Sequence, residues 1–455
     1  MRETPLSKLG ESRVLRAFMP IINAHNEQVA ATARQAGRIE PLEVGPGDDC
    51  AVLAAPAPGQ RTVVTTDTLV EDQDFMNLWP GGIARAGEAG EFILEPARSS
   101  GYDVGRKAAT QNLADVAAMG ARPASLFISL SLPGSTPYGW IDGFAHGIVD
   151  GINACGATEC VIGGGDIGDS TEMSVTVTAL GYTDRAVLRS GARPGDTIAL
   201  AGRTAWSDAG LRLLLNPLSL PATALLRAIA AGQSVEAALG AVAQAWAQRQ
   251  AEKQAEGSGA LPTGVLPEGL IELARTLTPE DAAHMIAVCE RAVASQHHPV
   301  SPIPAGEVAR QHQASSMLDL SDGLVKDAGR VAAASGVQMR LDRAAVDAFA
   351  EPLLPLARLL LAIGERNEAG ESPASLARTF VLVGGEDHGL LATFPGEVPE
   401  EFVPLGTCVA DAPERGLSAE LYGVERRHNA VTGAAVVMDG RSLDGMGWEH
   451  YGVSA

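Results

Sequence analysis

The segment Ser125-Leu-Phe-Ile-Ser-Leu-Ser-Leu132 alternates polar and apolar residues with a period of two, which predicts a strand with one buried face. The preceding residues 104–119 carry apolar side chains at helical spacing, and a glycine and a proline follow them as a stop. Two further strands are predicted at Thr62-Val-Val-Thr-Thr66 and Met173-Ser-Val-Thr-Val-Thr-Ala179. Strands and helices therefore alternate after an N-terminal amphipathic helix, and we predict an α+β domain over residues 1–184.

A second α/β domain is expected over residues 185–455. It begins where the turn-forming residues Arg193-Pro-Gly-Asp196 lead into the strand-like run Thr197-Ile-Ala-Leu-Ala201. Its other predicted elements are strands at residues 317–320 and 337–341, a helix at residues 322–334, and strands on either side of Gly384-Gly385. The expected fold class is therefore α+β, built as two α/β domains.

Three stretches resemble insertions, at residues 80–100, 248–308 and 364–375. The first is rich in Gly, Ala and Glu, and the other two are polar, with several prolines in the second. We expect them to be surface loops or helical excursions. The pair His297-His298 could ligate a metal, but its place beside a proline in a polar stretch favours a solvated loop.

Composition restricts the classes of partner. The 455 residues carry a formal charge of −21, from 34 Lys and Arg against 55 Asp and Glu, which disfavours nucleic acids and anionic membranes and favours cations. The first residues lack the pattern of a secretory signal, and no apolar run reaches the roughly 18 residues of a membrane span, so we expect a cytoplasmic protein. Five scattered cysteines predict reduced, packed thiols rather than disulfides or a zinc site.

Aspartates recur beside strand-like runs in both predicted domains. They are Asp48, Asp49, Asp67, Asp115, Asp166, Asp319, Asp322 and Asp387, the last of which follows Glu386. Rigid strand ends hold side chains in place, and carboxylates are preferred ligands of Mg²⁺, the ion that neutralises phosphates during phosphoryl transfer. Any single member has a simpler explanation: Asp48-Asp49 fits a turn and Asp322 fits a helix cap. The repetition favours a metal-dependent phosphoryl-transfer site.

Other nucleotide motifs do not fit. The stretch Gly163-Gly-Gly-Asp-Ile-Gly168 matches G-x-G-x-x-G, but Asp166 would face a pyrophosphate, and a strand rather than a helix is predicted next. The sequence contains no G-x-x-x-x-G-K-[ST], no protein-kinase signature, no G-x-S-x-G and no H-E-x-x-H. A protein that uses ATP without these motifs would bind it through acidic, glycine-adjacent loops and metal.

Several motifs that contain these aspartates occur together in a characteristic order. They are Gly47-Asp-Asp-Cys-Ala-Val52, Thr65-Thr-Asp-Thr-Leu-Val70, Asn112-Leu-Ala-Asp-Val-Ala-Ala-Met-Gly-Ala121, Ile162-Gly-Gly-Gly-Asp166, Leu188-Arg-Ser-Gly-Ala-Arg-Pro-Gly-Asp196, Leu318-Asp-Leu-Ser-Asp-Gly-Leu324 and Gly384-Gly-Glu-Asp387. In this order the chain resembles the thiamine-monophosphate kinase family, within the superfamily of aminoimidazole ribonucleotide synthetase. The resemblance runs from Leu9 to Tyr451, outside the three inserted stretches.

The resemblance implies an N-terminal domain that dimerises, a C-terminal α/β domain, and an active cleft between them. It implies ATP and thiamine monophosphate as substrates, several Mg²⁺ ions and a homodimer. By position, the implied Mg²⁺ ligands are Asp49, Thr65, Thr66, Asp67, Asp115, Asp166, Asp319 and Asp322. The implied ATP contacts are Gly165, Asp166, Arg189 and Ser321, and the implied acceptor contacts are Asp74, Glu386, Trp448 and Tyr451.

The implied chemistry requires no general base, so we expect no catalytic acid or base residue. The acceptor is a phosphate monoester that is already anionic at neutral pH, and the main obstacle is repulsion between two phosphorylated molecules. The cationic thiazolium ring of the acceptor could stack on Trp448 or Tyr451, although aromatic residues near a C-terminus often only pack against the protein. The chain departs from the family where Asp74 replaces a substrate-contacting His, Gly389 replaces an acidic residue and Ile167 replaces a common Thr. Asp74 alone also fits a solvated acidic loop.

Two alternatives stay open at the level of sequence. One is another ATP-dependent ligase or synthase of the superfamily, such as aminoimidazole ribonucleotide synthesis or selenophosphate synthesis; the absence of a cysteine before Cys50 disfavours the selenium enzyme. The other is a non-catalytic nucleotide- or Mg²⁺-binding protein that retains the fold, which the altered acceptor residues suggest.

Overall fold

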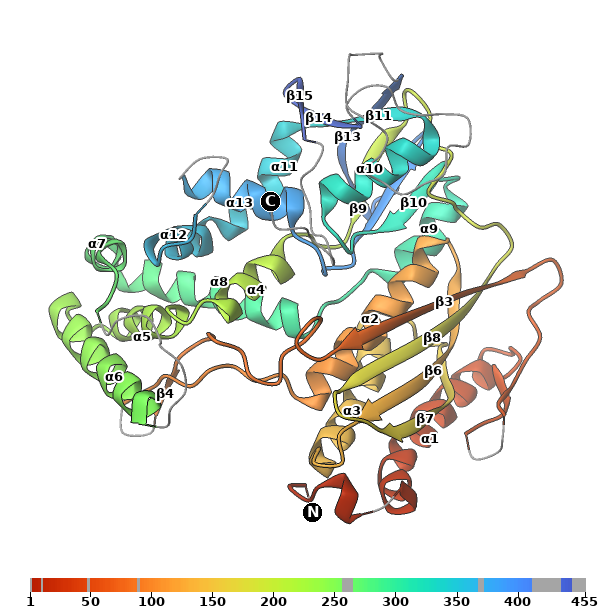
Figure 1. Cartoon of the computed structure of the whole chain (residues 1–455). Helices are drawn as coiled ribbons and strands as arrows, with labels where there is room; N and C mark the ends of the chain where they lie inside the picture. Colours follow the sequence, from red (N-terminus) through yellow and green to blue (C-terminus); the bar gives the residue numbers. More distant parts are fainter. Residues whose placement is uncertain are drawn as a thin grey trace.

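The computed structural model describes residues 2–9, 11–46, 50–87, 91–255, 265–366, 372–410 and 435–443. Within these residues the fold is mixed α+β and contains two main sheets, one of four strands and one of seven. Figure 1 shows the four-stranded sheet beside helices α2 and α3, with the seven-stranded sheet and a group of further helices on the other side of α2. The expected fold class is confirmed.

The smaller sheet has the strand order β3-β8-β6-β7. Its strands are β3 (Arg61–Val70), β8 (Ser174–Thr183), β6 (Arg122–Leu132) and β7 (Val161–Asp169). Neighbours are antiparallel except β6 and β7, which are parallel and are joined through a helix. Thus the strand predicted at residues 125–132 is the third strand of this sheet, and a strand rather than a helix follows the glycine-rich β7.

Three helices accompany this sheet: α1 (Glu11–Gln35), α2 (Gly101–Ala118) and α3 (Tyr138–Ala154). Helices α2 and α3 approach closely because glycines line their contact; a Cβ on Gly147 would lie 2.1 Å from the carbonyl oxygen of Tyr102. Ser100 caps α2 through a capping box with Asp103. Helix α2 also packs against β10 of the larger sheet, so it lies between the two sheets.

The larger sheet has the order β10-β12-β9-β13-β11-β14-β15, and only β11 and β14 pair in parallel. Its strands are β9 (Thr197–Ala201), β10 (Ser316–Asp319), β11 (Val337–Leu341), β12 (Leu390–Phe394), β13 (Phe402–Ala410), β14 (Val436–Met438) and β15 (Arg441–Ser442). The expected strands at residues 197–201, 317–320 and 337–341 are confirmed, the second with a shift of one residue. The predicted division between residues 184 and 185 falls between β8 and β9, and it stays a prediction.

The remaining elements are mostly helical. They are η1 (Leu6–Lys8), α4 (Trp206–Leu215), α5 (Ser219–Ala230), α6 (Val235–Ala255), α7 (Glu268–Thr276), α8 (Pro279–His297), α9 (Ile303–Gln311), α10 (Leu324–Ser335), α11 (Arg343–Ala350), η2 (Glu351–Leu353), α12 (Leu354–Ala362) and α13 (Pro373–Val383), with the short pairs β1 (Leu42–Val44) with β2 (Val52–Leu53) and β4 (Arg85–Ala86) with β5 (Phe92–Ile93). The expectation of a strand before Gly384-Gly385 is wrong, because α13 precedes these glycines. Its apolar residues are buried on a helical face.

Two of the three supposed insertions belong to the core. Residues 248–308 are largely helical, as one of the two expectations had it, but Cys289 of α8 is fully buried and α8 packs against α4 and α5, so a surface loop is wrong there. Residues 80–100 cross to the same helices, where the backbone N–H of Gly82 donates to Ser219 Oγ at 2.9 Å. Figure 1 shows this segment reaching the group of helices α4 to α6. Of the third stretch, residues 367–371 lie outside the described part of the chain.

In the described part of the chain, no single helix has both the length and the apolar character of a membrane span. The bent pair α4 and α5 meets that criterion only when taken together, with an angle of 105° between the two helices.

Candidate functional site

Aspartates from the two sheets approach each other around α2. Asp115 lies in the last turn of α2. Thr65 of β3 donates a hydrogen bond from Oγ1 to Oδ2 of Asp115 at 2.6 Å. Asp67, two residues further along β3, accepts a hydrogen bond from Gln111 Nε2 at 2.7 Å. Both carboxylates are therefore held in fixed positions by neutral donors. The strand extends to Val70, so the expectation that Asp67 ends a strand is wrong.

Asp319 joins these two residues from the larger sheet. It is the last residue of β10, one residue before the predicted end of this strand, and its Oδ2 lies 3.1 Å from Nδ1 of the buried His388. We call Asp67, Asp115 and Asp319 the carboxylate cluster. The pKa of Asp115 is raised to about 6, first by burial and then by the negative charge of Asp319, with a smaller contribution from Asp67. The three carboxylates thus share one electrostatic environment, although the smaller sheet, helix α2 and the larger sheet each supply one of them.

Asp322 has a different environment. Its carboxylate pairs with Arg330, and Lys326 Nζ lies 3.7 Å away. The alternative of a helix cap is wrong, because the residue that caps α10 is Gly323, at φ 108°, without a side-chain hydrogen bond. Asp327 accepts the backbone N–H of Asp322 at 3.0 Å, and burial raises the pKa of Asp327 to about 7. Two cations therefore already balance the charge of Asp322 in this structure.

The other residues expected on β3 and β7 lie apart from the cluster. Thr66 Oγ1 donates to the carbonyl of Val177 at 3.2 Å, on the neighbouring strand. Asp166 lies within β7, not at its end, and β7 is the opposite edge of the sheet from β3. Gly165 permits close approach of β6, since a Cβ there would lie 1.7 Å from the carbonyl oxygen of Ile128. The described structure therefore does not bring Asp166 together with Asp67.

Of the remaining expected positions, two lie within the described residues and three lie outside them. Arg189 is exposed after the last strand of the smaller sheet, and Ser321 accepts a hydrogen bond at its carbonyl oxygen from the Glu386 backbone N–H at 3.0 Å. Asp49, Trp448 and Tyr451 lie outside the described residues.

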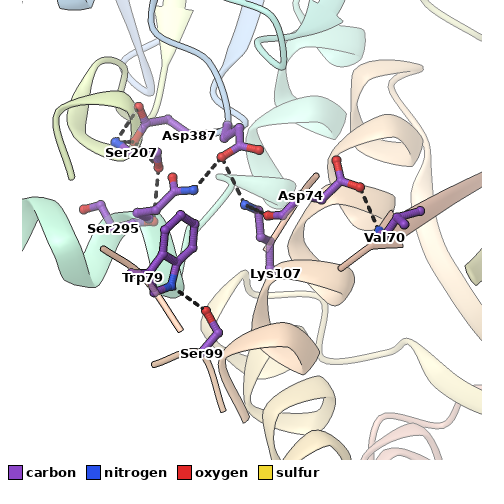
Figure 2. Close-up of polar contacts among 10 residues, drawn as sticks. Val70, Asp74, Trp79, Ser99, Lys107, Ser207, Ser295 and Asp387 are labelled. Carbon is purple, nitrogen blue, oxygen red and sulfur yellow. Dashed lines mark hydrogen bonds and ion pairs between the residues drawn. The ribbon is translucent and has the colours of Figure 1, made fainter. Parts of the chain in front are cut away.

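Glu386 forms a second centre, beside the cluster. Its backbone has φ 65°, an unusual conformation for a residue with a side chain, and its Oε2 accepts hydrogen bonds from Lys107 Nζ at 3.0 Å and from Gln296 Nε2 at 2.7 Å. Lys107 also donates to the carbonyl oxygen of Asp74 at 2.8 Å. Figure 2 shows Lys107 beside Asp74 within this group of contacts. Asp74 itself accepts the backbone N–H of Val70 at 2.8 Å, so it closes a turn rather than standing free in solvent.

Electrostatics distinguishes Glu386 from the cluster. Burial alone would raise the pKa of Glu386, but the charge of Lys107 and the hydrogen bonds from Gln296 and Lys107 together lower it. His388 connects the two centres, because it contacts Asp319 and its pKa is raised against the effect of burial by Asp319, Glu386 and Asp115. Sequence reasoning had marked Glu386 but not its partners.

Four residues of this region were missed from sequence. Lys107, Gln296 and His388 were not considered, and His298 was assigned to a solvated loop. That assignment is wrong, since His297 ends α8 and His298 Nε2 lies 2.5 Å from Oδ1 of Asp103. The available signals were a lysine within the apolar helical run of residues 104–119 and a histidine directly after Glu386-Asp387.

The donor set fits a magnesium ion only in part. Among the described residues, no three Asp, Glu, His or Cys side chains are arranged as a ready-made metal shell. Mg²⁺, however, usually takes one or two protein carboxylates and completes its shell with waters and substrate phosphates. The pKa of Asp115 is raised first by burial and then by the charge of Asp319, and a cation there would offset both effects. The chemistry of the cluster therefore suits such an ion.

Comparison with known proteins places this site in context. Residues 47–183 match the family model "AIR synthase related protein, N-terminal domain". The chain is 32% identical over 386 residues to a thiamine-monophosphate kinase of Mycobacterium tuberculosis, covering 84% of each chain, and 27% identical over 412 residues to one of Escherichia coli K12, covering 90% of this chain and 92% of that one.

Solved structures support the fold. One named "AaThiL complexed with AMPPCP and TMP" is 20% identical with a TM-score of 0.52, covering 98% of this chain and 99% of that one. A thiamine-monophosphate kinase from Stenotrophomonas maltophilia K279a is 22% identical with a TM-score of 0.53, covering 94% of this chain and 96% of that one.

Proposed function

This chain belongs to the thiamine-monophosphate kinase family, and we propose on that premise that it transfers the γ-phosphoryl group of ATP to thiamine monophosphate, giving thiamine diphosphate and ADP. The observation that carries the proposal is the carboxylate cluster. Asp67, Asp115 and Asp319 come from β3, α2 and β10, and the pKa of Asp115 is raised first by burial and then by the charges of Asp319 and Asp67. Such a site is suited to bind cations together with polyphosphates, in a protein whose net charge would otherwise repel both substrates.

We propose that carboxylates of this cluster bind Mg²⁺, with one or two of them contacting each ion. When bound, the ion would neutralise the phosphate oxygens and so reduce the charge repulsion between the two substrates. The protein contributes orientation. Thr65 fixes one oxygen of Asp115, Gln111 fixes one oxygen of Asp67, and His388 fixes one oxygen of Asp319. Carboxylates held in this way need no rearrangement when the charge develops.

The acceptor needs no proton to be removed from it. The attacking group is a phosphate oxygen that is already anionic at neutral pH, so the proposed mechanism contains no general base. Glu386 and Asp74 are proposed to contact the organic part of the acceptor, which carries a positive charge in its thiazolium ring. Lys107 holds both segments in place by donating to the Glu386 carboxylate and to the Asp74 carbonyl oxygen. Its role in this mechanism is positional.

The rest of the family pattern is carried over by position as part of this proposal. Further metal ligands are Asp49, Thr66, Asp166 and Asp322; further ATP contacts are Gly165, Arg189 and Ser321; further acceptor contacts are Trp448 and Tyr451. Asp322 is paired with Arg330 in this structure, so metal binding there would require this arginine to move. The proposal also includes a homodimer and a cytoplasmic location, where ATP is available.

A direct assay tests the proposal. Purified protein is incubated with ATP, thiamine monophosphate and Mg²⁺, and thiamine diphosphate and ADP are measured together. We expect equal amounts of both products and no reaction with EDTA. ADP formation without thiamine diphosphate would instead support another reaction of the superfamily, and ATP binding with no turnover at any Mg²⁺ concentration would support a binding protein.

A further inference from the structure

A small cavity is lined by Lys107 and Gln296, the two residues that donate hydrogen bonds to Glu386. Three separate segments line it: Asp74 and Trp79 precede the excursion of residues 80–100, Lys107 is on α2, and Gln296 and His297 end α8. Its enclosed volume is about 10 Å³, room for about one water, within an open depression of about 210 Å³ that includes solvent, so a ring would enter only as the lining side chains move apart. Figure 2 shows Trp79 and Lys107 facing this region from different elements.

Two polar atoms at this cavity have no hydrogen-bond partner in the described structure. They are Oε1 of Gln296 and Nε2 of His297, and both atoms are buried. Gln296 as a whole is only 3% exposed. Because its Nε2 donates to Glu386, its Oε1 is fixed as an acceptor that faces elsewhere. Leaving a buried polar atom without a partner is unfavourable, so these two atoms favour a ligand that can satisfy them.

The surrounding charges define the kind of ligand. Three carboxylates surround the cavity, those of Asp74, Asp103 and Glu386. Lys107 pairs with Glu386, and His298 contacts Asp103. Burial lowers the pKa of His297 to about 4, so this ring is neutral at pH 7 and does not repel a cation. A second phosphate would meet carboxylates here, whereas a purely apolar group would leave the two polar atoms unpaired. A heterocycle that bears N–H donors fits both conditions.

The walls suit an aromatic ring. Trp79 is held by a hydrogen bond from its Nε1 to Ser99 Oγ at 2.9 Å, and its ring centre lies 6.3 Å from that of His297. The indole N–H is therefore already used, and its ring presents an apolar surface of fixed orientation. This surface and the two unpartnered atoms belong to one cavity.

We propose that Gln296 and His297 are specificity-determining residues that bind the aminopyrimidine ring of the acceptor, Gln296 Oε1 accepting from its exocyclic amino group. This inference rests on the proposed function and extends it to residues of α8. The acceptor would span from its phosphate at the carboxylate cluster, past Glu386, to this cavity. His388 links the two regions, because it contacts Asp319 and its pKa is raised against the effect of burial in part by the charge of Glu386.

The test uses a substrate analogue that lacks only the amino group. Oxythiamine monophosphate carries an oxygen in place of that amino group, so it cannot donate the same hydrogen bond. We expect the wild-type protein to show kcat/KM at least about 30-fold higher for thiamine monophosphate, because a site built for a hydrogen bond rejects the analogue without it. Gln296→Leu and His297→Phe should lower kcat/KM for thiamine monophosphate about tenfold or more, reduce the preference, and leave KM for ATP unchanged.

A matched control separates this role from a general effect on α8. His284 lies on the exposed face of the same helix, and His284→Phe should retain the wild-type preference. Folded Gln296→Leu and His297→Phe variants with the wild-type preference would overturn the inference. So would a wild-type protein that uses both acceptors equally, a result that needs no variant to fold.

Failure of the proposed function is recognised separately. If the wild-type protein forms no thiamine diphosphate, binding of unphosphorylated thiamine and oxythiamine is measured by calorimetry without ATP. Tighter binding of thiamine that is lost in His297→Phe would support the cavity assignment. Equal binding of the two compounds, or no binding of either, would overturn it.

Discussion

Asp115 and Glu386 are both partly buried carboxylates near the meeting point of the two sheets, yet their pKa values move in opposite directions. Burial and the charges of Asp319 and Asp67 raise the pKa of Asp115 to about 6. For Glu386, Lys107 and Gln296 outweigh burial and lower the pKa. The carboxylate cluster thus lacks a neighbouring lysine or arginine contact in the described structure and is suited to a cation that arrives with the substrate, whereas Glu386 already has its cation.

The comparison shows that the partner, not the residue type, decides what a buried carboxylate does. A carboxylate surrounded by like charges stores unfavourable energy that a ligand can release. One that is paired and hydrogen-bonded contributes to a fixed structure. The predictions below test this contrast from both sides.

The largest effect is expected from Asp115→Asn. The variant keeps the shape of the side chain but removes one charge from the carboxylate cluster, so turnover should fall about 100-fold, as when a single stabilising group is removed from an active site. The free energy of unfolding should not fall, because the repulsion by Asp319 is removed. Both are measured, by product formation and by urea unfolding. As a control, Asp184→Asn changes an exposed aspartate and should leave both unchanged.

Lys107→Met should destabilise the protein by about 2 kcal/mol. The substitution leaves Glu386 without its cation and the Asp74 carbonyl oxygen without a donor; the side chain of Glu386 is one third exposed, which places the loss at the lower end for ion pairs that lose a partner. Guanidinium unfolding measures the loss. The double variant Lys107→Met with Glu386→Gln should recover most of it. The exposed pair of Arg85 and Glu95 is the control, where Arg85→Met should cost less than about 1 kcal/mol.

The two carboxylates should also respond oppositely to pH. The pKa of Asp115 in the folded chain, about 6, lies above its ordinary value of 3.8, so ionising it costs folding free energy as the pH rises from about 4 to about 6. In metal-free buffer, the free energy of unfolding of Asp115→Asn should therefore rise by about 1–2 kcal/mol relative to the wild type across this range. The difference should persist above pH 6. This magnitude is reduced because Asp115 is partly exposed.

Glu386 supplies the opposite case. Its pKa is lowered from 4.5, so its stabilising contribution is present at neutral pH and is lost as the pH falls below its ordinary value. The wild type should then exceed Glu386→Gln in stability at pH 7, and the two should converge in acid. Parallel pH curves for Asp115→Asn and Glu386→Gln would contradict the contrast between the two carboxylates.

The smallest effect is expected from Asp74→His. The variant removes the acceptor of the Val70 backbone N–H, which should cost about 1 kcal/mol in thermal or urea unfolding. Lys107 binds the carbonyl oxygen of Asp74 rather than its side chain, so the Glu386 centre should persist and KM for the acceptor should change less than about tenfold. A loss as large as that of Lys107→Met would mean that the Asp74 side chain itself supports Glu386.

Much of the local structure was predictable because it is encoded over short distances. Alternation at residues 125–132 identifies β6, and helical spacing at residues 104–119 identifies α2. The prediction failed before Gly384, where the apolar residues 380–383 end α13 instead of forming a strand, because a short apolar run fits a buried helix and a buried strand equally well. The prediction of a surface segment also failed for α8, because this helix has a buried face in addition to its polar one.

The candidate site was predictable only in its chemistry. Asp115 and Asp319 could be marked from sequence because each directly follows or lies within a recognisable element. Gln296 could not, since it is separated by 90 residues from the glutamate to which it donates a hydrogen bond, and the polar stretch around it resembled an insertion. The same holds for Lys107 and Glu386, which are 279 residues apart.

The sequence by itself determined that this protein carries many aspartates in ordered motifs, hence its family and a function that depends on cations and phosphates. Only the tertiary structure decided which carboxylates stand together, which have a cation of their own, and which atoms remain without a partner. The reason is that local patterns specify neighbours a few residues apart. Charge repulsion, desolvation and hydrogen bonding act through space between segments that only the packing of α2 against both sheets brings together.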